Sequence, residues 1–349
     1  MPFDRLAATK DQTHQISAIV SINEVIRQPP LPAHLLPIIS AIDLTYWRTY
    51  DYCAAIIRLY ASLERFILDV VGDWIRWVSK ADPTRFTDSS QLVDRYTFGV
   101  SEILRRRRED RFSGIKPGEL GGSLAALHAK GDISSLEVEA FYAGLPNLKL
   151  QDVLSLLTAV EIQDAGKWVL NFGPLVAFCR ASNATIEALL KDLVDRRNEA
   201  AHGNELPSNV LGRQPLKDLT DFVDHVCTAV AELVFERMTT IAIDAHGPAA
   251  AALLGTVEHL YPRSGACVIR SAGNPMNIGM NVIAKASDRC RPSKITSIQL
   301  ENVPHESVSP SNGVLVGLQL PVNPARGTSL YRLEGIPSID GLLDWAQFV

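Results

Sequence analysis

The period of the hydrophobic pattern changes once along the chain, and this change limits the fold more than any other feature of the sequence. Over residues 38–246, apolar residues recur mostly at spacings of three and four, which is typical of amphipathic helices. From about residue 262, short runs of alternating apolar and polar residues are separated by Gly, Pro, Asn and Ser, which is typical of strands. We therefore expect a mainly α protein, in which a helical bundle is followed by a small all-β C-terminal domain.

The run QPPLPAHLLP at 28–37 marks a further boundary. Its prolines lack amide donors and fix φ, so a helix cannot continue through it. We predict an N-terminal arm and Pro-rich joint over 1–37, a helical domain over 38–248 and a small β domain over 262–349. Helices are predicted over 38–78, 90–111 and 216–245, with a glycine-bearing loop at 113–122 and Ser182 or Asn183 as a helix cap.

The composition limits which class of protein this is and in which cellular compartment we expect it. The net charge of −5 argues against a protein that coats nucleic acid through bulk electrostatics, although a local basic groove stays possible. The five cysteines are scattered and form no CxxC pair, which favours reduced thiols. No signal-peptide run and no stretch of about 18 apolar residues is present. We expect a cytoplasmic protein without a membrane span.

Several familiar motifs are missing from the sequence. There is no P-loop, no GxGxxG after a strand, no HExxH and no GxSxG. None of the eight histidines pairs with Cys or a carboxylate at metal-ligand spacing. We therefore expect neither a metal site nor a cofactor.

The run LRRRRED at 104–110 contains Arg105, Arg106, Arg107 and Arg108. Four consecutive arginines on a helix point in nearly every direction around its axis, so some face solvent. The favoured interpretation is a solvated surface balanced by the acidic residues that follow. The other interpretation is a set of phosphate contacts that guides RNA toward a site.

The stretch DLVDRRNEAAHGN at 192–204 is the main candidate for chemistry. One interpretation is a helix C-terminus, in which cations offset the helix dipole and Gly203 takes the left-handed cap position. The other is an active site. DAHGP at 244–248 also places His before Gly at a predicted helix end without another catalytic signal, so the first interpretation stays open.

The helical period separates the possible site residues. Arg197 continues the apolar face of the helix and Arg196 lies beside it, whereas Asn198 and His202, four apart, share another face. Arg197 and His202 lie about 140° apart on an ideal helix. The helix could end near Ala201 so that His202 turns back. Alternatively, a second copy could pack across a two-fold axis and combine both pairs in one cleft.

These residue types suit RNA cleavage without a metal. A histidine side chain, which titrates near neutral pH, can take the proton of a ribose 2′-hydroxyl. An arginine can hold the adjacent phosphate and stabilise the charge of the transition state.

The stretch resembles the signature of the HEPN superfamily, which is Arg, four to six residues, then His. RNEAAH at 197–202 matches the four-residue form, and AAIIRLYASLERFILDVV upstream looks like the opening helix of HEPN proteins in prokaryotic defence and toxin systems. The resemblance covers about residues 40–246 and implies a HEPN-like helical bundle. The region 262–349 has no part in it.

The resemblance implies a metal-independent endoribonuclease that acts as a homodimer and leaves 2′,3′-cyclic phosphate ends. Carried over, Arg197 and His202 would be catalytic and Asn198 a supporting polar residue, with Arg196 as a weaker RNA contact. Such proteins act as toxins or defence effectors, with an antitoxin or defence-system partner. Some carry a modified Tyr two positions after the His, but Asn204 stands there.

Two alternatives stay open. One is a non-catalytic HEPN-like module for dimerisation or for nucleotide or RNA binding within a larger defence assembly. The other is a purely structural subunit. In each case the β domain would recognise a substrate, a partner or an activating signal.

Overall fold

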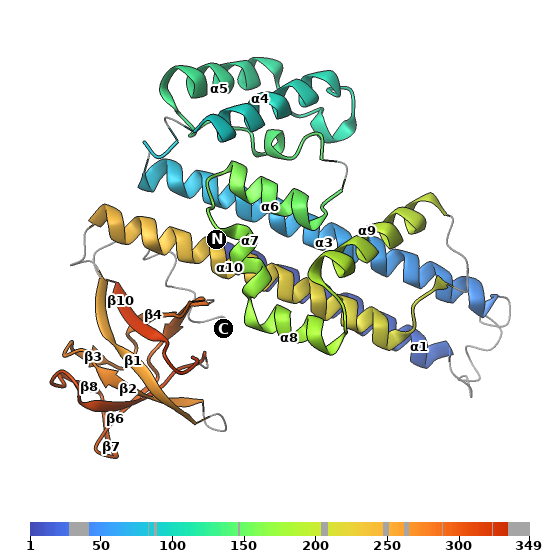
Figure 1. The fold of residues 1–349 in the computed structure, drawn as a ribbon. Helices are drawn as coiled ribbons and strands as arrows, with labels where there is room; N and C mark the ends of the chain where they lie inside the picture. The colour runs from blue at the N-terminus through green and yellow to red at the C-terminus, as the bar shows by residue number, and fades with distance from the viewer. Residues whose placement is uncertain are drawn as a thin grey trace.

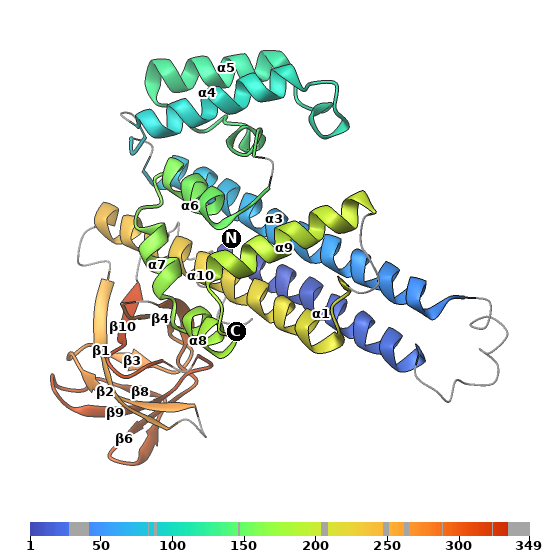
Figure 2. The same ribbon diagram turned by 45° about the vertical axis from the view of Figure 1, so that its right-hand side comes forward.

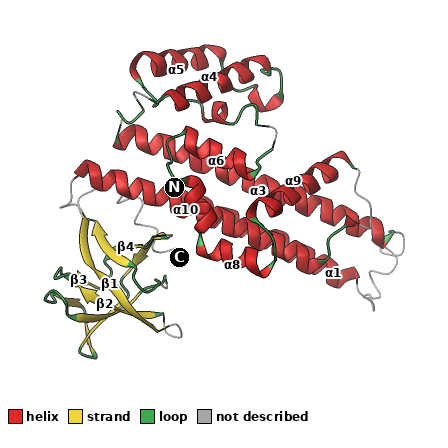
Figure 3. Ribbon diagram, in the orientation of Figure 1, coloured by secondary structure: helices red, strands yellow, loops and turns green. Residues whose placement is uncertain are grey.

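The computed structural model describes residues 1–27, 42–82, 84–86, 89–145, 147–203, 209–246, 251–261, 265–287, 289–322 and 324–333. The Pro-rich joint at 28–37 and Asn204 lie outside the described residues. A helical part is followed by a β-sheet part, as the change of period predicted, and Figure 3 separates the two by colour.

The helical part is built around three long helices and carries shorter helices on one side. The α-helices are α1 (Pro2–Arg27), α3 (Leu44–Ala81), α4 (Ser90–Arg105), α5 (Pro117–Lys130), α6 (Leu150–Ala159), α7 (Ala165–Asn171), α8 (Gly173–Ala181), α9 (Ile186–His202) and α10 (Arg213–His246). Two 3₁₀ turns, η1 (Asp110–Phe112) and η2 (Val138–Phe141), join them. In Figures 1 and 2, α1, α3 and α10 run side by side, while α4 and α5 form a separate layer above α6.

Helix α1, expected as part of an arm, packs along α3 and α10. The Phe3 ring lies 5.3 Å from that of Phe235 in α10, and Leu6 is buried in the same core. Arg5 Nε donates to Asp73 Oδ2 of α3 at 2.9 Å. The helical pattern of α1 looks modest because Thr9 occupies a buried position that an apolar residue would usually fill.

Two local predictions between α4 and α9 were wrong. The stretch 113–122 is not all loop, because α5 begins at Pro117, whose fixed φ suits a first helical turn. The cap of α9 is Thr185 and neither predicted residue: its hydroxyl accepts from the Ala188 amide at 3.1 Å. Asn183 instead has a φ of +49° in the turn between α8 and α9.

The β part forms one antiparallel eight-stranded sheet with the order β5-β4-β10-β1-β2-β9-β6-β7, beside a small β3–β8 ribbon. The strands are β1 (Ala251–Tyr261), β2 (Ala266–Ser271), β3 (Met276–Asn277), β4 (Asn281–Lys285), β5 (Cys290–Lys294), β6 (Ser297–Leu300), β7 (Val303–His305), β8 (Ser307–Val308), β9 (Leu315–Gln319) and β10 (Ser329–Leu333). The sheet begins at Ala251, before the boundary expected at 262. Its first residues repeat alanine without clear alternation, and pairing with β10 makes them a strand.

The edge strand β5 attaches the sheet to α10. Arg291 donates to the fully buried carboxylate of Glu232, whose Oε2 also accepts from the Cys290 amide at 3.3 Å. Lys285 Nζ lies 2.7 Å from Glu236 Oε1. Burial raises the pKa of Glu232, although Arg291 lowers it. The sheet is thereby held at one end of the bundle, away from α9 in both views (Figures 1 and 2).

Candidate active site on helix α9

Helix α9 is anchored by its first half and leaves its C-terminal end exposed. Its buried residues end at Val194, the turn that follows is half-buried, and Glu199, Ala201 and His202 are exposed. In Figures 1 and 2 the C-terminal end of α9 extends beyond α3. Gly203 caps it with a φ of +67°, which confirms the prediction of a left-handed glycine cap.

Arg197 faces α3, as the apolar period predicted, and rests on Tyr60. The guanidinium carbon lies 4.9 Å from the centre of the Tyr60 ring, and Arg197 Nη1 donates to Asn198 Oδ1 at 3.0 Å. The ring is fixed in place, because its hydroxyl accepts from the Leu148 amide at 2.9 Å. Burial raises the pKa of Tyr60, so the phenol stays neutral beneath the cation.

The Arg197 guanidinium keeps donors for another ligand. Of its five N–H groups, one bonds to Asn198, and no other hydrogen bond to a described residue is formed. The same bond draws the guanidinium toward the face of α9 that carries Asn198 and His202.

Arg196, the neighbour of Arg197, is held by protein groups. Its Nε donates to Asp192 at 2.8 Å, and its Nη1 donates to the Tyr52 hydroxyl at 3.0 Å and to the Asn209 carbonyl at 3.3 Å. Burial alone would lower the pKa of Arg196, but the bonds to Asp192 and Tyr52 raise it overall. Arg196 therefore joins α9 to α3 and to the segment before α10. Its role as an RNA contact stays a prediction.

His202 lies at the exposed end of α9, one turn after Asn198. Its ring forms no hydrogen bond with another residue of the described part of the chain. Because the helix continues through His202, the arrangement in which it ends near Ala201 is not found. Arg197 and His202 therefore lie on different faces of α9 within one copy of the chain.

The arginine run lies in a different layer from α9. The helix expected to reach residue 111 ends at Arg105, so Arg106, Arg107 and Arg108 follow it in a turn. Arg105 pairs with Glu102 at 2.6 Å and Arg106 with Glu109 at 2.7 Å. Arg107 and Arg108 are exposed.

In the described part of the chain, no three His, Cys, Asp or Glu side chains converge as a metal site would require. No helix in that part combines the length and the apolar character that crossing a bilayer requires. No disulfide joins the five cysteines.

The family of this chain follows from a match to a protein-family model. The family model RiboL-PSP-HEPN matches residues 34–236, which is more than half of the chain and includes α3, α9 and the RNEAAH stretch. The chain is a HEPN protein of the RiboL-PSP type. HEPN families are typically ribonucleases, and the matched HEPN region ends before the sheet. No curated protein and no solved structure shows significant similarity to the chain.

Two tyrosines beside the last turns of α9 were not singled out from the sequence. Tyr52 and Tyr60 both lie on α3 and contact neighbouring arginines of α9. In the sequence, Tyr60 is one member of a broad apolar stripe. The only available signal is that both tyrosines interrupt aliphatic residues on a buried helix face.

Proposed function

We propose that this HEPN protein is a metal-independent endoribonuclease with Arg197 and His202 as catalytic residues and Asn198 as a supporting residue. The observation that carries the proposal is the arrangement at the end of α9. A guanidinium held on Tyr60 and bonded to Asn198 keeps free donors, and an exposed imidazole follows one turn later. A helix cap alone requires neither the aromatic support nor the bond to Asn198.

The reaction is an internal attack on the RNA backbone. A His202 imidazole takes the proton of the ribose 2′-hydroxyl, and the 2′-oxygen forms a bond to the adjacent phosphorus. The bond from phosphorus to the 5′-oxygen breaks, and that oxygen takes a proton from an imidazolium. Arg197 stabilises the charge on the phosphoryl oxygens. The products are a 2′,3′-cyclic phosphate and a 5′-hydroxyl.

The site is completed by a second copy of the chain. Arg197 and His202 lie on different faces of one helix, so two α9 ends related by a two-fold axis would supply both groups to one cleft. Two histidines would then serve as base and acid. The exposed Arg107 and Arg108 are the better placed RNA contacts of the arginine run, because Arg105 and Arg106 are paired. We assign the protein to toxin or defence effectors.

The test is cleavage of total cellular RNA in the presence of EDTA, with mapping of the product ends. We expect the wild type to cut and to leave cyclic phosphate ends, and His202→Ala to lose at least about a hundredfold in rate. His128→Ala is the matched control, because His128 is also exposed in the last turn of a helix that a left-handed glycine caps. It should cut like the wild type.

Two results would contradict the proposal. Equal cutting by the wild type and His202→Ala would remove His202 from the mechanism. RNA binding without cleavage, in a homodimer of confirmed fold, would assign the protein to the non-catalytic binding modules.

A further inference from the structure

The face of the sheet opposite its core carries a groove of about 570 Å³ across β2, β9 and β6. Its floor is made by Ala266, Val268 and Gly317, and the register places Val268 opposite Gly317 and Ala266 opposite Gln319. Cys267, which alternates with the floor residues, is fully buried in the core of the sheet. The groove is therefore a feature of the solvent side and lies away from α9.

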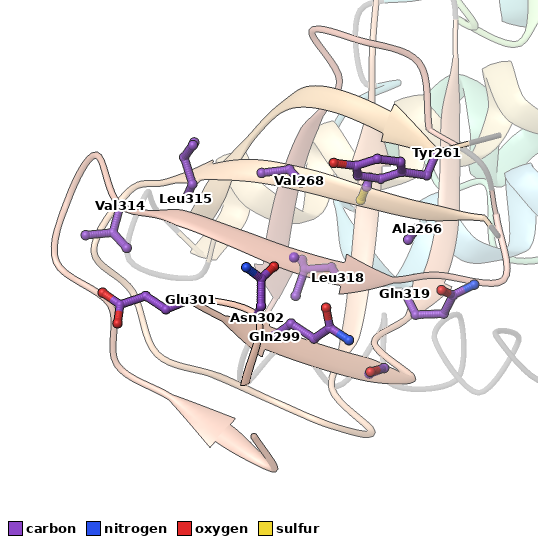
Figure 4. A pocket seen from close by; sticks show the side chains of 13 residues that line it. Tyr261, Ala266, Val268, Gln299, Glu301, Asn302, Val314, Leu315, Leu318 and Gln319 are labelled. Carbon is purple, nitrogen blue, oxygen red and sulfur yellow. The ribbon is translucent and has the colours of Figure 1, made fainter. Parts of the chain in front are cut away.

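The groove is hollow because its floor is small and its ends are large. A Cβ added at Gly317 would lie 3.4 Å from the Cβ of Gln299, so any larger residue would fill the space. Tyr261 stands at one end with 51% of its surface exposed, and its ring packs in a T-shaped contact with that of His259 at 5.3 Å. Leu315 and Val314 stand at the other end, as Figure 4 shows.

Polar side chains also line the groove: Gln299 and Asn302 lie between these ends, and the Glu301 carboxylate lies at the end with Val314 (Figure 4). Gln299 comes from β6, and Glu301 and Asn302 come from the turn between β6 and β7. The turn residues have φ values of +52° and +64°, a conformation that asparagine tolerates better than most residues. None of the three side chains forms a hydrogen bond with another described residue. Each amide can donate two hydrogen bonds and also accept, so the set offers both donors and acceptors to a ligand.

The charge of the groove lining disfavours anionic ligands and favours neutral ones. Among the described residues, the lining contains one carboxylate, Glu301, and no Lys, Arg or His. A bound phosphate or carboxylate is normally held by charged donors. An anion here would meet Glu301 without a compensating cation among the described lining residues. Proteins that follow a nucleic-acid strand likewise use a positively charged groove.

We propose that this groove binds a neutral saccharide. A sugar ring has an apolar C–H face, which suits the exposed ring of Tyr261, and a rim of hydroxyls, each of which donates and accepts. The amides of Gln299 and Asn302 and the carboxylate of Glu301 match such a rim. The volume lies within the range of roughly 300–1,000 Å³ that is usual for ligand pockets. This inference is independent of the ribonuclease activity.

The experiment uses the full chain and an array of neutral oligosaccharides of glucose, galactose, mannose and N-acetylglucosamine. A saccharide that is retained is then titrated into the wild type and into two variants by calorimetry. We expect Tyr261→Ala to bind about tenfold more weakly, because the ring that packs on the sugar is lost. Tyr46→Ala is the matched control: Tyr46 is 73% exposed on α3, outside the groove, and its loss should leave the affinity unchanged.

If Tyr261→Ala is poorly folded, a second variant tests the same groove. Gly317→Leu should fill the groove and abolish binding, while the cooperative thermal unfolding of the chain is retained. If the wild type retains no saccharide on the array, the proposal is overturned. Equal affinity of the wild type and Tyr261→Ala would overturn it as well. Binding of uridine, adenosine or an RNA oligomer in place of saccharides would assign the groove to nucleobases. His202→Ala should bind the saccharide normally, which separates this result from the outcome of the cleavage test.

Discussion

Arg196 and Arg197 are adjacent in the chain, yet their side chains have different surroundings. Arg196 stabilises the fold, because its guanidinium donates hydrogen bonds to Asp192 and to Tyr52. Arg197 lies on an aromatic ring, which positions the cation without consuming its N–H donors. A phosphate can therefore be held by Arg197 with little competition from protein acceptors.

This difference predicts the effect of replacing Tyr60, a positioning residue. Tyr60→Leu should lower the cleavage rate at saturating RNA about tenfold, because the surface beneath the cation is lost. Tyr60→Phe keeps the ring and should stay within about threefold of the wild-type rate. It should lower the free energy of unfolding by about 1 kcal/mol, because the Leu148 amide loses its acceptor.

A double-mutant cycle separates positioning from a general loss of stability. In an Arg197→Ala background, Tyr60→Leu should produce no further loss of the residual cleavage rate. An equal further loss in that background would show that Tyr60 acts on the fold alone.

At the residue scale, the sequence allowed the prediction of which groups are polar at the end of α9 but not of how they are oriented. The period correctly placed Arg197 toward the bundle, and the glycine correctly predicted the cap. The support from Tyr60 could not be predicted, because it depends on how α9 crosses α3. Crossing angles are set by side chains on both helices and leave no local signal.

At the scale of elements, the errors of prediction occurred where tertiary contacts outweigh local preference. The glycines after Pro117 favour a loop, yet burial of Leu120 and Leu127 keeps them helical. Similarly, β1 starts in a run of alanines that has no strand pattern of its own. The long helices were predicted well, because their apolar faces are broad and continuous.

The contact between α1 and α3 gives a prediction about pH. Asp73 of α3 is largely buried and accepts from Arg5, from the N-terminal ammonium group and from Arg76. Burial alone would raise the pKa of Asp73, but these bonds hold it well below the usual 3.8. The folded chain therefore binds fewer protons here than the unfolded chain. The stabilisation is complete above about pH 5 and is lost as the pH falls through and below 3.8.

Asp73→Asn tests this dependence. At pH 7 the variant should lose about 2 kcal/mol of the free energy of unfolding. The difference from the wild type should shrink as the pH falls from 5 to 3, as measured by urea unfolding at each pH. Asp69→Asn is a matched control, because Asp69 is more exposed and accepts from Arg5 at 3.3 Å and from the exposed Arg65 at 2.9 Å. A difference that stays constant with pH would show that the charge of Asp73 is not the cause.

At the scale of the whole molecule, the proposed cleavage site and the saccharide groove lie at opposite ends of α10. The start of α10 follows the segment that bonds to Arg196, and its later turns carry Glu232, which holds the sheet. A change of period along the chain predicted both parts. It could not predict their attachment, because Glu232 reads as one polar residue in an apolar helix and its partner lies in another part of the chain.

The attachment should depend on the pairing of Glu232 with Arg291. Arg291→Ala leaves a fully buried carboxylate without its cation, a change that typically costs about 3–5 kcal/mol. We expect a lower midpoint of urea unfolding and faster proteolysis between the helical part and the sheet. Arg270→Ala is the matched control, because Arg270 pairs with Glu258 on the surface, where exposed ion pairs contribute little.

Replacing both Glu232 and Arg291 by Leu should recover much of the lost stability, since no buried charge is then left unpaired. Equal unfolding midpoints for Arg291→Ala and Arg270→Ala would show that the sheet is held by its apolar contacts, such as Ile283 in the helical core, and not by this ion pair.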